Sequence, residues 1–181
     1  MSILKVNEVQ TTASKRILTT TGGIINIVQQ KITAPWFGYG PGSSYVKVTP
    51  LTCSIKPTST SNKILVVYRF FGGSTGSWDR LEYQLYRNGS ASSFIGNAGG
   101  SAGQASGKWF YPAAADIGMT QAMGLVYLDS PASTSVQTYD IYIRDGNGDG
   151  AGFSLNRGRG TTGSEQESNC ASSVTLMEIT A

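Results

Sequence analysis

Apolar and polar residues alternate along two stretches of the chain, residues 81–87 and 139–144. In the first stretch Leu81, Tyr83 and Leu85 are separated by single polar residues. A period of two residues indicates β-strands that bury one face and expose the other. With the other short apolar stretches, the spacing predicts strands at residues 45–55, 63–71, 81–88, 123–129, 136–144 and 173–180.

The segment Ile64-Leu65-Val66-Val67-Tyr68 differs from the other strands because it is apolar on both faces. A small antiparallel sandwich buries only one face of each sheet, so this strand requires a cover on its outer side. The pattern leaves two candidates for that cover, which are a partner subunit and the chain's own N-terminal segment.

Residues 1–33 have a different pattern from the rest of the chain. Three short apolar stretches are separated by Thr, Ser and Gly, and none is large enough to fold alone. We therefore predict an extended N-terminal arm at residues 1–33 and one domain at residues 34–181. The apolar residues expected to attach the arm to a partner protein are Leu4, Val6, Val9, Ile17, Leu18, Ile25 and Ile27.

Composition favours the same fold class. The chain has 23 glycines and only 14% charged residues. This mixture disfavours long amphipathic helices and suits short strands joined by glycine-rich turns, so we predict an all-β antiparallel sandwich. The chain has no histidine, which excludes His-based catalytic triads, His-ligated metal sites and imidazole proton relays.

Charge and apolar run length limit the partners that we expect. The net charge of +3 is small and scattered, so we do not expect nucleic-acid binding. No apolar run approaches the length of a membrane span, and the N-terminus lacks the apolar core of a signal peptide. Cys53 and Cys170 are predicted to be buried thiols rather than a disulfide, since free cysteines are commonly buried in apolar strands.

Residues 145–150, Asp-Gly-Asn-Gly-Asp-Gly, match the first half of a calcium-binding loop. Asp145, Asn147 and Asp149 stand at the alternating ligand positions of that loop. Its twelfth position carries a bidentate glutamate, whereas this chain has Asn156 there and lacks flanking helices. A glycine-rich turn between strands is the better interpretation, and weak calcium binding is the alternative.

Several aromatic and basic residues fall in turn-rich segments and are candidates for receptor contact. Aromatic residues in loops either cover the end of a core or form exposed platforms for sugar rings or a protein. Basic residues in loops are either solvated or paired with acidic glycans. The candidates are Trp78, Trp109, Tyr111, Arg157 and Arg159.

Four stretches of the chain together resemble small virion appendage proteins of tailed bacteriophages, cyanophages especially. The stretches are 3–10 (ILKVNEVQ), 51–66 (LTCSIKPTSTSNKILV), 129–139 (DSPASTSVQTY) and 173–179 (SVTLMEI). They are similar to that group's N-terminal attachment segment, its strand-turn-strand, its hairpin into a tyrosine-led strand and its closing strand. The loops between residues 89 and 122 and between 145 and 172 have no counterpart.

The resemblance implies a jelly roll like the trimeric heads of the tumour-necrosis-factor type, without enzymatic activity or cofactor. The expected role is a fibre knob in the virion, assembled in the host cytoplasm and docked to another virion protein by its arm. A host surface glycan or protein is its expected receptor. In a homotrimer the doubly apolar strand lies at the subunit interface, with interface residues Ile64, Val66, Tyr68 and Phe70.

Three alternatives to the fibre knob remain at this point. A capsid decoration protein fits the short chain, which has little room for a fibre shaft. A polysaccharide depolymerase requires a pair of carboxylates, and Glu165 and Glu167 are the closest pair in the sequence. A free carbohydrate-binding module is disfavoured by the separate apolar arm.

Overall fold

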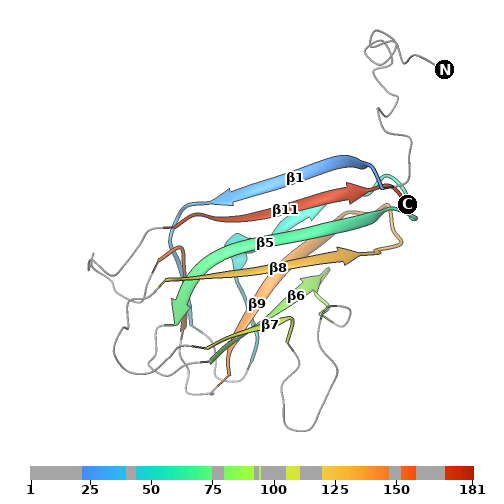
Figure 1. The fold of residues 1–181 in the computed structure, drawn as a ribbon. Coiled ribbons are helices and arrows are strands. Elements are labelled where there is room, and N and C mark those ends of the chain that lie inside the picture. Colours follow the sequence, from blue (N-terminus) through green and yellow to red (C-terminus); the bar gives the residue numbers. More distant parts are fainter. Residues whose placement is uncertain are drawn as a thin grey trace, which may run out of the picture.

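The computed structural model describes residues 22–39, 44–74, 80–91, 94, 105–110, 120–146, 152–157 and 170–181. These residues form strands and one short 3-10 turn (Figure 1). The elements are β1 (Ile24–Ile32), β2 (Trp36–Tyr39), β3 (Val46–Lys47), η1 (Thr49–Leu51), β4 (Cys53–Ile55), β5 (Lys63–Ser74), β6 (Arg80–Arg87), β7 (Gly107–Phe110), β8 (Gln121–Asp129), β9 (Gln137–Asp145), β10 (Gly152–Leu155) and β11 (Ser172–Ile179). Within these residues no helix is long and apolar enough to cross a membrane. The prediction of an all-β protein is confirmed.

The strands form two antiparallel sheets, sheet A and sheet B, which pack against each other (Figure 1). In sheet A, β11 lies between β1 and β5, and β8 pairs with the other edge of β5. Strand β10 pairs with the last residues of β5, and β2 pairs with β10. In sheet B, β9 lies between β6 and the short strands β3 and β4, and β7 pairs with the outer edge of β6.

The chain crosses repeatedly between the two sheets, as it does in a jelly roll. From β4 in sheet B it passes to β5 in sheet A, returns to β6 and β7, crosses to β8 and returns to β9. It then ends in β10 and β11 of sheet A, so that the first and last strands are neighbours. This order confirms the predicted antiparallel sandwich of the jelly-roll type.

The six predicted strands are all present, and one of them is divided. The predicted strand 45–55 is interrupted by η1, which contains Pro50 and separates β3 from β4. Proline has no N–H to donate to a neighbouring strand, so the pairing with β9 is broken at this point. The inward side chain of Leu51 is nevertheless fully buried.

Four strands lie in segments that the sequence pattern assigns to the arm or to turns, namely β1, β2, β7 and β10. Glycine accounts for two of these differences. A Cβ atom on Gly38 in β2 would overlap the Trp36 ring, and one on Gly107 in β7 would overlap the Tyr83 ring. In both strands glycine leaves room for an aromatic ring, whereas in the sequence it resembles a turn residue.

Alternate side chains of β5 point into the sandwich. Ile64, Val66, Tyr68 and Phe70 are at most 1% exposed and belong to the hydrophobic core. The prediction that these four residues line a subunit interface is wrong, because sheet B of the same chain already covers them. The outward positions of β5 are the ones available to a partner.

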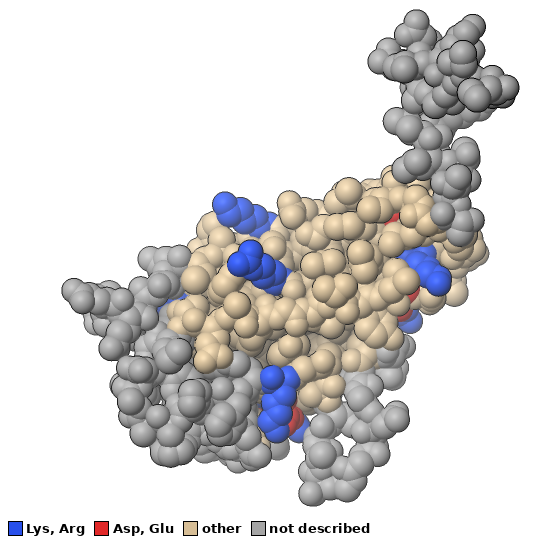
Figure 2. Space-filling model, viewed as in Figure 1, with Lys and Arg blue, Asp and Glu red and all other residues tan. Residues whose placement is uncertain are grey.

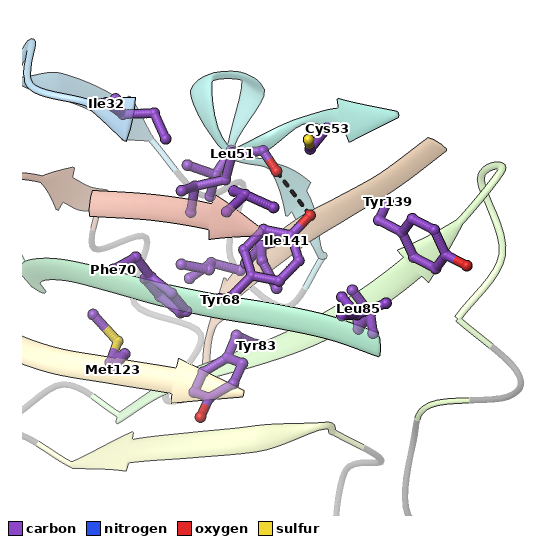
Figure 3. Packing of buried hydrophobic residues seen from close by; sticks show 14 of the residues in the cluster. Ile32, Leu51, Cys53, Tyr68, Phe70, Tyr83, Leu85, Met123, Tyr139 and Ile141 are labelled. Carbon is purple, nitrogen blue, oxygen red and sulfur yellow. Dashed lines mark hydrogen bonds between the residues drawn. The ribbon is translucent and has the colours of Figure 1, made fainter. Parts of the chain in front are cut away.

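Two inward aromatic side chains of β5 connect the sheets (Figure 3). The Tyr68 hydroxyl donates a hydrogen bond to the backbone oxygen of Leu51, at 3.0 Å. The ring of Phe70 packs edge-on against Tyr83, with 5.4 Å between centroids. A buried tyrosine requires a partner for its hydroxyl, and Leu51 supplies one inside the core.

Strand β1 belongs to the sandwich rather than to a separate arm. It pairs with β11 from Ile24 to Ile32, and the Ile32 side chain is buried. The side-chain amide of Asn156 donates hydrogen bonds to the backbone oxygens of Ile32 and Ala34, at 2.9 and 3.0 Å. The predicted boundary at residue 33 is therefore wrong for residues 24–32, and residues 1–21 lie outside the described part.

Deletion of residues 1–33 is expected to lower the free energy of unfolding by more than about 2 kcal/mol, because it removes the pairing of β1 and the buried Ile32 side chain. Deletion of residues 1–21 removes no described pairing, so its melting temperature should stay close to that of the full chain. Thermal unfolding followed by circular dichroism compares the three proteins. Equal melting temperatures for both deletions would contradict the place of β1 in the sandwich.

Candidate functional site

The outward side of sheet A carries a continuous apolar surface, which we name the apolar face. Its residues come from β1, β11, β5 and β8 and form two cross-strand rows. One row is Ile27, Met177, Leu65 and Leu128, and the adjoining row contains Val67 and Val126. Neighbouring side chains on one face of a sheet pack together, so these six residues make one surface.

The apolar face is open to solvent over much of its extent. Val126 is 67% exposed, Ile27 58% and Leu128 48%. Figure 2 shows this side of the molecule as a broad uncharged surface with lysine and arginine at its margins. Single exposed apolar residues are common on monomeric proteins, whereas a contiguous group usually marks an interaction site.

The apolar surface continues around the edge of sheet A. Within the described residues β8 pairs with β5 alone, so its other edge has no neighbouring strand. Tyr127 on β8 is 37% exposed, and Phe94 packs edge-on against its ring with 4.9 Å between centroids. The protein therefore presents an apolar face and an adjoining apolar edge.

Basic residues surround the apolar face. Lys31 and Arg69 lie in the next cross-strand row, and Lys63 begins β5 at the opposite end. The Arg69 guanidinium lies over the ring of Phe71, 4.9 Å from its centroid. An apolar centre with a polar rim is the usual composition of a protein interface.

The outward side of sheet B is polar and aromatic, and we name it the tyrosine face. It comprises Tyr45, Lys47, Glu82, Tyr86, Lys108, Asp140, Tyr142 and Arg144. Tyr86 and Tyr142 are both half-buried and stack with their ring centroids 3.9 Å apart. Ion pairs between neighbouring strands flank this pair of rings.

Glu82 is the central carboxylate of the tyrosine face. The Nε and Nη2 atoms of Arg144 donate to its Oε2, at 2.8 and 2.6 Å, and the Lys108 Nζ lies 3.1 Å from its Oε1. Burial raises the pKa of Glu82, but hydrogen bonds and charges from Arg144 and Lys108 outweigh burial and hold its pKa below the ordinary value. Glu82 is therefore ionised at neutral pH.

A second ion pair and a phenol complete the tyrosine face. The Lys47 Nζ lies 2.8 Å from the buried Oδ1 of Asp140. The Arg144 guanidinium lies 4.8 Å from the centroid of the Tyr45 ring. Burial is the main cause that raises the pKa of Tyr45 to about 12, so this phenol stays neutral at physiological pH.

Two further buried acids hold the ends of strands together. Asp129 lies at the end of β8, and each of its carboxylate oxygens accepts a hydrogen bond from the Arg87 Nη1 atom at 2.7 Å. Its Oδ2 also accepts one from the Tyr139 hydroxyl at 2.7 Å. Burial and the Asp129 carboxylate raise the pKa of the Tyr139 hydroxyl well above its ordinary value. These contacts tie sheet A to sheet B, and they are structural.

Glu178 on β11 has a similar structural role at the same end of the sandwich. Its Oε1 accepts hydrogen bonds from the backbone N–H and hydroxyl of Thr58, both at 2.7 Å, and from the Asn62 amide at 2.6 Å. Thr58 and Asn62 belong to the turn between β4 and β5. The carboxylate therefore fixes the turn that carries the chain from one sheet to the other.

Of the five predicted receptor-contact residues, the structure describes Arg157 and the backbone of Trp109. Arg157 follows β10, and its guanidinium lies 5.5 Å from the centroid of Phe37 in β2. The backbone of Trp109 lies in β7. Trp78, Tyr111 and Arg159 lie outside the described residues, and so does the carboxylate pair Glu165 and Glu167.

Two of the predicted attachment residues belong to β1. Ile27 is exposed on the apolar face, and Ile25 is half-buried. The remaining five, Leu4, Val6, Val9, Ile17 and Leu18, lie outside the described residues. The structure therefore assigns Ile27 to the surface of sheet A rather than to a separate segment.

The structure describes one of the three candidate calcium ligands and both cysteines. Asp145 ends β9 and is 1% exposed, whereas Asn147 and Asp149 lie outside the described part. No group of three or more acidic or cysteine side chains suited to a metal ion occurs among the described residues.

Cys53 is a buried free thiol whose pKa is raised by burial, and Cys170 is a half-buried free thiol.

Sequence comparison with known protein families and with characterised proteins gave no match. The two outward faces therefore provide the basis for inferring a function. The alternation of residues in the sequence already indicated part of the tyrosine face. It places Glu82 and Tyr86 on one side of β6. It likewise places Asp140, Tyr142 and Arg144 on one side of β9. Only the register between these strands shows which of them are neighbours.

Glu82→Gln is expected to lower the free energy of unfolding at neutral pH by about 1.5–3 kcal/mol, because charge-assisted hydrogen bonds to Arg144 and Lys108 are lost. The pKa of Glu82 is lowered from 4.5 in the folded protein, so this stabilisation is complete above that value and is lost as the pH falls through the folded pKa. Urea unfolding at neutral and acidic pH should show the gap between wild type and variant closing in acid. A gap that is constant with pH would contradict the role of the ionised carboxylate.

Proposed function

We propose that this chain is a non-enzymatic structural protein of a tailed-phage virion, in which it forms a homotrimeric knob. The observation that carries the proposal is the apolar face of sheet A, which exposes Ile27, Val126 and Leu128. Covering this face with a second copy of the chain removes apolar surface from water, at roughly 25 cal/mol per Å². The second copy would cover Leu65 and Val67, which are the outward residues of the doubly apolar strand β5.

The shape of the apolar surface supports a ring over a two-fold dimer. The surface includes both the face of sheet A and the edge of β8 that no other described strand pairs with, where Tyr127 is exposed. In the proposed contact, the edge of one subunit packs on the face of the next. Contacts between two different patches generate closed rings when the rotation closes, and a trimer is the ring that the phage resemblance implies.

Residues 1–21 serve docking in this proposal. They precede Gly22, the first described residue, whose N–H donates to the backbone oxygen of Thr180 at 2.8 Å. The chain enters and leaves the sandwich at the same end (Figure 1). The apolar residues that then contact another virion protein are Leu4, Val6, Val9, Ile17 and Leu18, and the knob points away from that protein.

Leu128→Asp is expected to convert the trimer to a folded monomer, because a charge on the apolar face opposes burial of that face against a second copy. Light scattering on the purified protein should give the mass of three 19.1 kDa chains for wild type and one for the variant. Val136→Asp is the matched control, since Val136 is 55% exposed in the turn before β9. A monomeric wild type would refute the proposed assembly.

Mass spectrometry of purified phage particles is expected to detect this chain in the virion, and separated tails and capsids decide between a fibre knob and a decoration protein. Detection with the tail fraction supports the fibre knob. Detection with the capsid fraction supports decoration. A chain found in infected cells and not in purified particles would refute the structural role.

A further inference from the structure

Acidic and basic side chains occupy different depths in this protein. Every acidic residue among the described residues is buried and at most 6% exposed, namely Glu82, Asp129, Asp140, Asp145 and Glu178. The basic residues of the same part that are exposed are Lys31, Lys56, Lys63, Arg69 and Lys108. The charge that this part of the molecule presents to solvent is therefore positive, which favours a negatively charged partner.

The tyrosine face joins this positive charge to aromatic rings. The Lys47, Lys108 and Arg144 side chains are 36%, 48% and 22% exposed, while the carboxylates of Asp140 and Glu82 beneath them are 5% and 8% exposed. An approaching ligand therefore meets ammonium and guanidinium groups first. The stacked pair of Tyr86 and Tyr142 adds half-exposed ring surface and phenol groups beside these cations.

The tyrosine face also has the position that a receptor site requires. It is the outward side of sheet B, and the apolar face is the outward side of sheet A, on the opposite side of the sandwich. When subunits associate through sheet A, the tyrosine face stays on the outside of the assembly. The inference thus deepens the proposed function, on which this orientation rests.

We propose that the tyrosine face binds an anionic polysaccharide, a polymer of sugar rings that carries carboxylate groups. Lys47, Lys108 and Arg144 attract the acid groups, and Tyr86 and Tyr142 contact the faces and hydroxyl groups of the sugar rings. The hydroxyls of Ser54 and Thr138, paired at 2.8 Å on the same side of sheet B, add hydrogen-bonding groups beyond Asp140.

The balance of charges favours a polysaccharide over nucleic acid. Three cations on the tyrosine face are opposed by two buried carboxylates, Glu82 and Asp140, so the excess positive charge is small. A phosphate backbone carries a charge on every nucleotide and is bound by several unopposed lysines and arginines. A polymer with fewer acid groups and many hydroxyls is the better match to this surface.

Isothermal titration calorimetry of the full chain tests the proposal with three probes. These are polygalacturonate as the anionic polysaccharide, dextran as the neutral one and single-stranded oligo-dT as a polyanion without uronic acids. We expect binding to polygalacturonate that weakens with added salt, and no measurable binding to dextran. Stronger binding to oligo-dT than to polygalacturonate, or binding to neither polysaccharide, would overturn the proposal.

Two variants and a matched control locate the site. Lys108→Gln leaves Glu82 paired with Arg144, and Tyr86→Leu keeps apolar contact with Tyr142, so both are expected to fold. Each should weaken polygalacturonate binding about tenfold, the loss of one charge-assisted contact or one ring contact. Lys31→Gln removes the same charge from β1 on the opposite side and should change affinity by less than about twofold. Equal losses for Lys31→Gln and Lys108→Gln would refute a site on the tyrosine face.

The mass of the assembly separates this inference from the proposed function. A trimer that fails to bind polygalacturonate refutes the polysaccharide site and leaves the structural role standing. A monomer that binds polygalacturonate through Lys108 and Tyr86 supports the site and refutes the assembly through the apolar face. Thermal melting of each variant confirms that the measured protein is folded.

Discussion

Strand β5 is hydrogen-bonded along both edges, and the rest of the sandwich is arranged around it. Its inward residues from Ile64 to Phe70 fill the core, so sheet B must pack over them. Its outward residues, Leu65 and Val67, are apolar as well and lie between matching residues of β11 and β8. A strand that is apolar on both sides therefore accounts both for the packing of sheet B against sheet A and for the apolar surface on the outward side of sheet A.

The two outward faces of the sandwich differ in how their side chains interact with water. On sheet A the six residues of the apolar face are outward and apolar, and burial against protein would remove them from water. On sheet B the outward positions carry charges that neutralise one another across strands, as Glu82 does with Arg144 and Lys108. The molecule is thus two-sided, with an apolar surface on sheet A and a charged, aromatic surface on sheet B.

Buried acidic residues hold the segments that connect the two sheets. Asp129 and Glu178 each accept several hydrogen bonds where the chain crosses from one sheet to the other. A buried carboxylate is costly unless it is paired, so its partners are held in one geometry. Because these acids are buried, the exposed charges of the described residues belong to lysines and arginines.

The sequence by itself determined the fold class and the positions of six strands, because alternation and apolar runs follow directly from which side of a strand is buried. It also indicated that one strand needed a cover on both sides. Tertiary structure alone decided which side of β5 faces the core, since both sides of this strand are apolar and no alternation marks the buried one. Tertiary structure also placed β1 beside β11 and brought Glu82, Arg144 and Lys108 together, because strand register depends on residues far apart in the chain.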